Sequence, residues 1–554
     1  MFENQPKGLY VLALANTGER FGYYTMLAIL LLFLQAKFAF STATAGMIYS
    51  SFLALVYFMP MIGGWIADKW NFTKTVSMGI IVMFFGYLVM AIPTQAHNNM
   101  SLVIMIVALF LISCGTGLFK GNLQVMVGDL YNNPKYADRR DVAFSLFYMA
   151  INIGAMFAPS ITEYLCNMAL KDGGLSYNAA LPSLCNSYLF DLASMKPAAL
   201  AKLQVLADGQ IGQHVTDLTA FCSHYINSIS IGYSYAFAVA CFSMVISFLI
   251  YKLGKRTYIK TETKEKSAEN VSNEPELTKE QTKSRIIALL LVFAVVIFFW
   301  MVFHQNGATL TKFAEIFTLQ SCAGWTRIGF NVWALALIVV GIYAVFSLFQ
   351  SKSAKAKIIS GIITVAVIVG IYLFYNGTPD PVTSIQPQKY QQFNPFYVVA
   401  LTPFSVLIFT WLGKIGKEPS APRKIGYGML VAAAAYVIMV IASWSLGVPP
   451  AQGTSDTLVS PNWLISTYLV LTFAELLLSP MGISFVSKVA PPKYKGMMMG
   501  CWFGATAIGN YLVSIPTMLW NKIELPMLWG LLIVICLLSA LFIFSIMKKL
   551  EKVC

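Results

Sequence analysis

Five ionisable side chains lie deep inside stretches that are otherwise apolar, and they are the residues best placed to do chemistry. They are Glu19, Arg20, Lys120, His304 and Glu475. A charge at membrane depth is costly, so such residues usually face a bundle interior or a water-filled cavity along a transport path. Because the five residues fall on four different apolar stretches, they predict one shared polar cavity.

The stretches that must position these residues are predicted to be membrane helices. The chain has 554 residues, of which 57% are hydrophobic and only 11% are charged, and its mean hydropathy is +0.67. A soluble protein of this length carries about a quarter charged residues, so most of this chain is expected to lie in lipid. Apolar runs of about 20 residues predict an all-α integral membrane protein with about fourteen transmembrane helices. The runs lie near 9–35, 45–67, 74–93, 101–119, 143–165, 232–251, 285–305, 331–349, 357–375, 395–413, 424–446, 462–487, 497–518 and 525–547.

Lysine and arginine are concentrated in alternate loops, which indicates the orientation of the chain. One side collects the basic groups near 69–74, 135–140, 252–256, 352–357, 414–424, 488–495 and 548–552. The opposite loops hold chiefly Lys312, Arg327, Lys389 and Lys522. This positive-inside bias predicts a multi-pass protein of the cytoplasmic membrane with both termini in the cytoplasm. Basic loops that face the anionic headgroups of the bilayer account for the net charge of +14, without a nucleic-acid partner.

A charged stretch from Gly254 to Arg285 has the composition of a solvated linker and divides the chain into two halves. The second half holds two more predicted spans than the first. The surplus pair is most simply placed at 331–375, a hairpin whose helices are expected to contain no ionisable residue and to face lipid. The predicted parts are an N-terminal bundle with five spans (1–165), an outward loop (166–231), span six (232–252), a cytoplasmic linker (253–284), span seven with an outer loop (285–330), the hairpin (331–375) and the rest of the C-terminal bundle (376–554).

The outward loop at 166–231 is long for a compact membrane protein. We expect a small helical cap there, with a partner-binding surface as one use. Four cysteines fall in the predicted outward loops: Cys166, Cys185, Cys222 and Cys322. In an oxidising compartment they could form up to two disulfides. The pairing cannot be read from the spacing, and free thiols are an equal alternative.

The first span carries a polar face. Its members are Asn16, Glu19, Arg20, Tyr23, Tyr24 and Leu27, whose spacing places them on one side of a helix. Adjacent side chains do not face each other on a helix, so Glu19 and Arg20 are expected to find partners on other helices. The alternative is a buried ion pair that only stabilises helix packing.

Lys120 and Glu475 are isolated charges in two further spans. Lys120 lies in CGTGLFKGNLQ, where small residues allow close helix approach. It could act inside the bundle, or it could extend along the apolar surface to the membrane boundary. Glu475 lies in TFAELLLSPMG, with Ser479 one turn further on. A lone carboxylate at that depth is suited to binding a cation or a proton.

Several motifs resemble known transporter sequences. GGWIADKWNFTK, at 63–74, resembles the loop signature of the major facilitator superfamily, whose fold is two six-helix bundles around a central cavity. ERFGYY (19–24), GTGLFKGN (115–122), FYMAINIGAMFAP (147–159), NPF (394–396), ELLLSPMG (475–482) and MMGCWFGATAIGN (498–510) resemble, in order, helix motifs of the proton-dependent oligopeptide transporter family. The resemblance implies two six-helix bundles plus the extra hairpin, whose place after span seven departs from that family.

The resemblance also implies roles for individual residues. Lys120, with Tyr24 and Arg20, would bind a peptide carboxylate, and Glu475, with Asn152 and Asn394, would bind the peptide amino group. Ser479 would belong to the same peptide site. Glu19, Arg20, Lys120 and His304 would couple proton movement. The side-chain pockets would be lined by Tyr23, Tyr57, Tyr148, Trp300 and Trp502.

Three positions depart from the family pattern. Asn16 stands where the family usually has Glu, Leu27 where it has Arg, and His304 where it has Asp or Glu. The last two family residues normally form an ion pair between the bundles, and replacing both avoids leaving one charge unpaired. Since imidazole titrates near pH 6.5, we hypothesise that His304 is an outward-side proton site coupled to gating. The alternative is a neutral, hydrogen-bonded histidine that lines the cavity.

The resemblance predicts a symporter that uses protons to import di- and tripeptides without a cofactor, a metal or covalent chemistry. A monomer is expected, although the sequence does not determine the oligomeric state. One alternative is a major-facilitator transporter of another solute, such as an amino acid, nitrate or a drug. Another is a membrane enzyme such as an acyltransferase that uses His304, although no nucleophile or acid lies at a telling spacing around it.

Overall fold

The computed structural model describes residues 5–96, 98–131, 135–136, 140–259, 278–351, 353–491 and 494–552. Some residues on which expectations rest lie outside these ranges, namely Arg139, Lys352, Lys493, Cys554 and most of the linker expected at 253–284. Within the described ranges the chain forms helices, and β-pairing is limited to two isolated bridges, Thr318 with Val459 and Cys322 with Val382. The expected all-α fold is confirmed.

A long helix forms at each of the fourteen predicted apolar runs in the described part of the chain. Twelve of these helices are long and apolar enough to cross a membrane. The other two are α5 (Arg140–Asp172) and α17 (Lys495–Leu512). In lipid, every backbone N–H and C=O must be hydrogen-bonded within the protein, and a helix meets this requirement along its own length.

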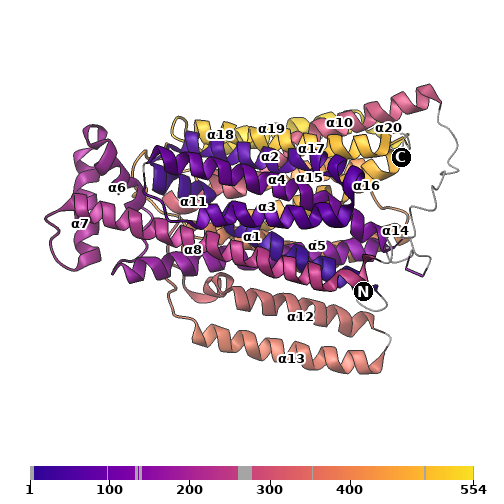
Figure 1. The fold of residues 1–554 in the computed structure, drawn as a ribbon, viewed down its shortest axis with the longest axis horizontal. Helices are drawn as coiled ribbons and strands as arrows, with labels where there is room; N and C mark the ends of the chain where they lie inside the picture. The colour runs from indigo at the N-terminus through magenta and orange to yellow at the C-terminus, as the bar shows by residue number, and fades with distance from the viewer. Residues whose placement is uncertain are drawn as a thin grey trace.

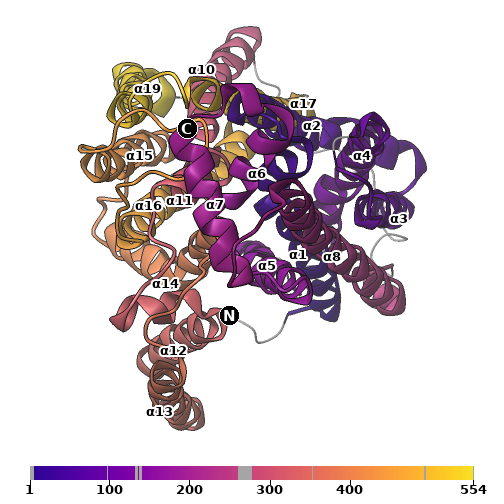
Figure 2. The ribbon, with the colours of Figure 1, turned by 90° about the vertical axis from the view of Figure 1, so that its left-hand side faces the viewer.

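The first half of the chain forms a bundle around its own apolar core. Figure 2 shows its helices, in indigo to magenta, on one side of the molecule. Among the described residues, the bundle consists of α1 (Lys7–Phe38), α2 (Thr42–Trp70), α3 (Phe72–Ala91), α4 (Asn99–Asp129), α5 and α8 (Leu218–Leu253). Helix α1 is enclosed because it packs against both α5 and α8, so Leu12, Ile29 and Leu34 are fully buried.

The second half forms another bundle with a separate core. Its described helices, mostly orange to yellow in Figure 2, are α10 (Lys279–Phe303), α14 (Phe393–Lys414), α15 (Ala421–Ala442), α16 (Asn462–Val489), α17 and α19 (Leu525–Ser545). Trp520 and Trp529 are fully buried in this core, with ring centroids 6.2 Å apart. Two bundles with separate apolar cores match the expected major-facilitator architecture.

The two ends of the molecule differ. Figure 1 shows both chain termini at one end, which we call the termini end. The short helices α6 (Leu181–Phe190) and α7 (Pro197–Ile211) cover the opposite end, which we call the cap end. Because α5 continues to Asp172 and α8 begins at Leu218, Cys166 and Cys222 lie in helices, and the expectation that they occupy a loop was wrong. Both are free thiols, as are Cys185 and Cys322.

Helices α12 (Val332–Gln350) and α13 (Ala354–Gly377) lie beside the two bundles, at the edge of the molecule (Figures 1 and 2). Helix α12 reaches the bundles through two aromatic contacts, Phe346 with Phe404 and Phe157 with Trp333. Helix α13 packs mainly on α12. Ile362 and Ile368 on α13 are 65% and 62% exposed. An exposed surface this apolar is typical of a helix that faces lipid.

Two adjacent glycines on α2 have different surroundings. A Cβ on Gly63 would lie 2.1 Å from the carbonyl oxygen of Gly117 on α4, whereas a Cβ on Gly64 would meet nothing within 4 Å. The side chain of Asn122 also donates to the carbonyl oxygen of Gly63, at 3.1 Å. Gly63 is therefore required for the close approach of α2 to α4, and Gly64 is not.

We predict opposite effects for Gly63→Ala and Gly64→Ala. The first should lower the free energy of unfolding by about 1–3 kcal/mol, because the added methyl group overpacks the α2–α4 contact. The second should leave it unchanged or raise it by up to about 1 kcal/mol, because alanine is the better helix former. Thermal unfolding of both variants in detergent measures the difference, and equal loss of stability in the two would contradict the packing argument.

Candidate functional site

The polar face of α1 carries a buried ion pair. Glu19 and Arg20 are 0% and 4% exposed, and Nε and Nη2 of Arg20 donate to the two carboxylate oxygens of Glu19. The expectation that these adjacent residues find their partners on other helices was wrong, because they pair with each other. Successive side chains leave a helix about 100° apart, but the long arginine side chain folds back to form a bidentate pair.

Aromatic rings adjoin this pair. The Cζ atom of Arg20 lies 4.8 Å from the ring centroid of Tyr23, which in turn stacks on Phe52 of α2. Tyr24 packs edge-on against Tyr23 at 5.2 Å. Tyr23 is buried, whereas Tyr24 is partly exposed. The polar face of α1 therefore turns into the protein, where ring faces add favourable contacts to the arginine charge.

Lys120 on α4 reaches toward α2. Its Nζ lies 3.7 Å from the ring centroid of Tyr57, and the side chain is partly exposed. Lys120 is also close enough to Glu19 and Arg20 to interact with both electrostatically. The charges of α1 and α4 thus form one group within the N-terminal bundle.

Glu475 on α16 is held by hydrogen bonds from both bundles. Tyr148 Oη of α5 donates to Oε1 at 2.9 Å, and Asn394 Nδ2 of α14 donates to Oε2 at 2.8 Å. The Asn394 amide also donates to Thr472 Oγ1 at 3.1 Å. Asn152 lies one turn from Tyr148 on α5, and its amide donates to the backbone oxygen of Tyr148 at 3.0 Å. Both donors to Glu475 are neutral, so its charge is solvated but not neutralised.

His304 lies at the start of a 3-10 turn, η4 (His304–Gly307), directly after α10. The ring stacks on Trp300 at 4.9 Å and lies 6.2 Å from the ring of Tyr57. Nδ1 is hydrogen-bonded to Oδ1 of Asn510 on α17. His304 is also within electrostatic range of Lys120. Through Tyr57 and Lys120, the histidine adjoins the charged group of the N-terminal bundle.

Tyr24 and Tyr57 connect the charged groups of the two bundles. Each interacts electrostatically with Arg20 on one side and with Glu475 on the other. Most of the predicted site residues therefore converge on the region between the bundles. Two lie apart from these contacts. Trp502 packs against Gly482 and Phe293 within the C-terminal core, and Ser479 lies one turn beyond Glu475 on α16.

Sequence reasoning missed two members of this region, Thr472 and Asn510. Thr472 lies almost one turn before Glu475, a spacing that could have signalled a shared face. Asn510 ends the quoted motif at 498–510, but nothing local indicates that it bonds His304. Within the described chain, five buried donors near the site have no hydrogen-bond partner: Asn16 Nδ2, Tyr49 Oη, Tyr87 Oη, Trp300 Nε1 and Asn510 Nδ2. Such donors are available to a ligand or to water.

The two bundles are joined at the cap end by polar contacts between α5 and a 3-10 helix, η6 (Pro387–Gln392). Lys389 forms an ion pair with Glu163, which also accepts from the backbone N–H of Gln386 at 3.1 Å. Ser160 Oγ donates to Gln392 Oε1 at 2.8 Å. None of these pairings was predicted. They connect residues more than two hundred positions apart, which no local pattern relates.

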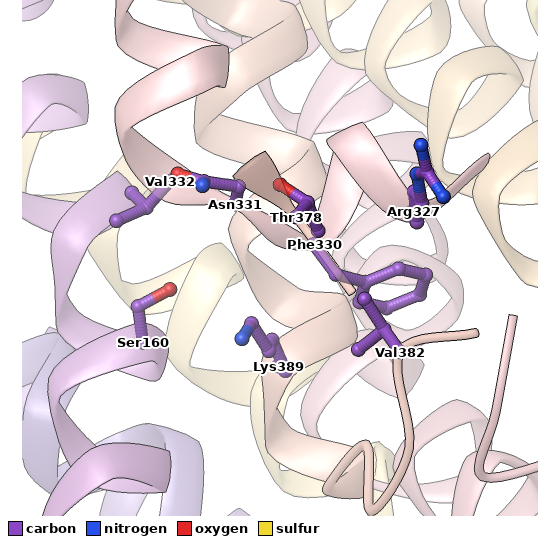
Figure 3. A pocket seen from close by; sticks show the side chains of 8 residues that line it. All are labelled: Ser160, Arg327, Phe330, Asn331, Val332, Thr378, Val382 and Lys389. Atoms are coloured by element: carbon purple, nitrogen blue, oxygen red, sulfur yellow. The ribbon is translucent and has the colours of Figure 1, made fainter. Parts of the chain in front are cut away.

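A pocket of about 300 Å³ opens beside these contacts (Figure 3). Figure 3 shows Lys389 extending toward Ser160 and Asn331, with Arg327 on the far side of Phe330. Both cations are already paired, Lys389 with Glu163 and Arg327 with Asp380. We therefore take the region around Lys120 and Glu475, and not this pocket, as the candidate substrate site.

Comparison with known proteins identifies the family. The chain matches the model of the POT family over residues 73–277 and 361–527. The "Uncharacterized transporter YclF" of Bacillus subtilis (strain 168) is 28% identical, over 96% of this chain and 91% of that protein. The "Di-/tripeptide transporter" of Lactococcus lactis subsp. cremoris is 27% identical, over 91% and 87%. A crystal structure of a mutant "peptide transporter POT" with alafosfalin superposes with a TM-score of 0.65 and 21% identity, over 100% and 96%.

The chain therefore belongs to the POT family. It is a secondary membrane transporter and not an enzyme. The matched segments contain Lys120, Asn394 and Glu475, whereas Glu19 and His304 lie outside them.

The ion pair at the cap end generates a stability prediction. Glu163→Gln should lower the free energy of unfolding by about 1–3 kcal/mol, because it leaves the ammonium of Lys389, 14% exposed, without a carboxylate. The double variant Glu163→Gln/Lys389→Met should recover part of this loss, since no unpaired charge remains. Glu551→Gln, which breaks the more exposed pair with Arg423, is the control and should have little effect. Thermal unfolding in detergent tests all three, and equal effects of Glu163→Gln and Glu551→Gln would contradict the argument.

Proposed function

We propose that this chain is a monomeric, proton-coupled symporter that imports di- and tripeptides across the cytoplasmic membrane, with both termini in the cytoplasm. The observation that carries the proposal is the state of two opposite charges on opposite bundles. Lys120 contacts the ring of Tyr57 and has no carboxylate within ion-pair distance in the described chain. Glu475 receives hydrogen bonds only from the neutral groups of Tyr148 and Asn394 there. Each charge is therefore available to one end of a zwitterionic solute.

A short peptide is suited to this arrangement. Its carboxylate would bind Lys120, with Arg20 and Tyr24 nearby, and its amino group would bind Glu475 beside Asn394 and Asn152. The variable side chains would lie among aromatic rings such as Tyr57 and Trp300, which tolerate different shapes. Because the two termini are recognised at a defined separation, long peptides would be excluded. The di- and tripeptide activities named for the matched relatives support this substrate class.

Proton coupling is assigned to the ion pair on α1. Protonation of Glu19 would remove the charge that holds Arg20 and would free a cation for the substrate carboxylate. Deprotonation on the cytoplasmic side would restore the pair and release the peptide. Lys120 would share this role, because it lies within electrostatic range of both residues.

Alternating access requires the two bundles to separate at one end at a time. In the structure, α5 and η6 are in contact at the cap end through Glu163 and Lys389. We infer that these contacts break when the cap end opens. The basic loops at the termini end support a cytoplasmic location for that end.

We call the proposed binding of the two peptide termini by Lys120 and Glu475 the clamp. Each of its two charges can be tested separately. We predict that Lys120→Gln and Glu475→Gln each lower proton-driven dipeptide uptake into liposomes by about tenfold or more, because each removes a charged hydrogen-bonding partner. A dipeptide amide lacks the carboxylate that Lys120 would bind. The parent should therefore take up the free dipeptide faster than the amide, and Lys120→Gln should reduce the ratio of the two uptake rates. Glu475→Gln should narrow the preference over an N-acetylated dipeptide instead.

Two exposed residues give matched controls for this experiment, Lys414→Gln and Glu280→Gln. Both should transport like the parent protein. Full uptake by the Lys120 and Glu475 variants, or the same loss of preference in both, would rule out the two-ended clamp. Uptake of an amino acid or a nitrate salt in place of dipeptides would favour the transporter alternatives.

His304 is proposed as a further proton site in the region between the bundles. Its surroundings are Trp300, Tyr57, Asn510 and the more distant Lys120. We predict that His304→Gln changes the pH dependence of uptake, because an imidazole can take up a proton as the external pH falls. Glutamine keeps a hydrogen-bonding group for Asn510 but cannot take up a proton.

The control for this variant is His224→Gln, an exposed histidine of α8 that is hydrogen-bonded to the backbone oxygen of Gly173. Uptake by liposomes across a series of external pH values measures the effect. An unchanged pH profile in His304→Gln would leave His304 as a neutral residue that lines the cavity.

A further inference from the structure

A second pocket, of about 270 Å³, lies at the termini end between α3, α8 and a 3-10 turn, η3 (Gly254–Thr257). Figure 1 shows α3 and α8 close together, and the two helices pack against each other. Three lysines from these three elements line the pocket: Lys74, Lys252 and Lys255. All three are exposed, and none is within ion-pair distance of a carboxylate in the part of the chain that is described. The pocket therefore concentrates positive charge.

The local backbone adds to this positive character. Lys74 lies in the first turn of α3, where the helix dipole is positive and attracts anions. The floor of the pocket is rigid, because the rings of Tyr251 and Tyr258 stack at 5.2 Å and Tyr258 Oη donates to the backbone oxygen of Tyr251 at 2.7 Å. Like charges held together on such a floor repel one another, so an anion that bridges them is stabilised.

The pocket continues into an apolar surface. Met78 and Ile81, which follow Lys74 along α3, also line the pocket and are 44% and 39% exposed. Phe85 lies further along α3, and Leu249 and Phe242 are exposed apolar residues of α8, with exposed fractions of 52%, 50% and 64%. A soluble anion would use only the lysines. A ligand with a charged head and long apolar chains would use both parts.

We propose that this pocket and the adjoining apolar surface of α3 and α8 bind an anionic glycerophospholipid of the leaflet at the termini end. The phosphate bridges Lys74, Lys252 and Lys255, and the acyl chains lie along the exposed apolar residues of α3 and α8. The site is distinct from the substrate region between the bundles, and it does not depend on the proposed transport activity. The proposed site differs from a general attraction of basic loops to the membrane, because it consists of one pocket and three particular lysines.

The experiment compares lipid binding to the purified full-length protein by native mass spectrometry. Phosphatidylglycerol should bind the parent. The triple variant Lys74→Gln/Lys252→Gln/Lys255→Gln should bind it about tenfold or more weakly, because the variant loses the three charges that attract the anionic headgroup. The control triple variant Lys414→Gln/Lys417→Gln/Lys549→Gln makes the same change in net charge with exposed lysines elsewhere at the termini end. It should bind like the parent.

Three further arms identify the occupant. Diacylglycerol with the same acyl chains should bind weakly, and inorganic phosphate should not displace the lipid at equal concentration. Replacing the five glutamates of residues 260–277 by glutamine should leave lipid binding unchanged. Equal binding by the two triple variants would overturn the site, and displacement by inorganic phosphate would overturn a lipid as its occupant. Binding of phosphatidylglycerol only after these substitutions would show that the linker occupies the pocket instead.

Discussion

A charge inside an apolar protein has to be compensated by the protein itself, and the candidate site depends on this constraint. Glu19 and Arg20 meet it by pairing with each other on α1, so this helix can run through the bundle interior with two full charges. Lys120 and Glu475 have no such ionic partner among the described residues. Lys120 lies over the ring of Tyr57, and Glu475 accepts hydrogen bonds from neutral groups. Where internal compensation is incomplete, the remaining charge is available to a ligand.

The two-bundle fold converts these charges into a site shared by both halves of the chain. Each bundle has an apolar core built mainly from its own half of the chain, and the halves meet through packing of α2 on α17 as well as through polar contacts. At the cap end these contacts are an ion pair and several amide hydrogen bonds between α5 and η6. In the central region Tyr148 of one bundle bonds Glu475 of the other. Polar contacts can be exchanged for water or substrate more readily than a packed apolar interface can be opened.

The charged residues between the bundles and the lysines at the termini end differ in how far their side chains are exposed. The charges between the bundles are buried or partly exposed, and they contact rings and amides. Lys74, Lys252 and Lys255 are exposed at the boundary of the apolar surface, where lipid headgroups are expected. The hairpin of α12 and α13 adds a peripheral apolar surface and contributes few polar contacts to the bundles. The proposed substrate site and the proposed lipid site thus lie in different parts of the molecule.

The sequence by itself determined the helices and most of the charged residues of the site. Apolar runs predict helices because lipid leaves the backbone no other partner, and Lys120, Glu475 and His304 stand out because charges are rare in such runs. Only the tertiary structure decided the partners. Glu19 turned out to pair with its neighbour Arg20, and Asn510 with a histidine far away in the sequence. Glu163 and Lys389 form an ion pair between the bundles although each looked unremarkable locally. Helix formation depends on neighbouring residues, whereas these pairings depend on how the bundles pack, which brings distant residues within hydrogen-bonding distance.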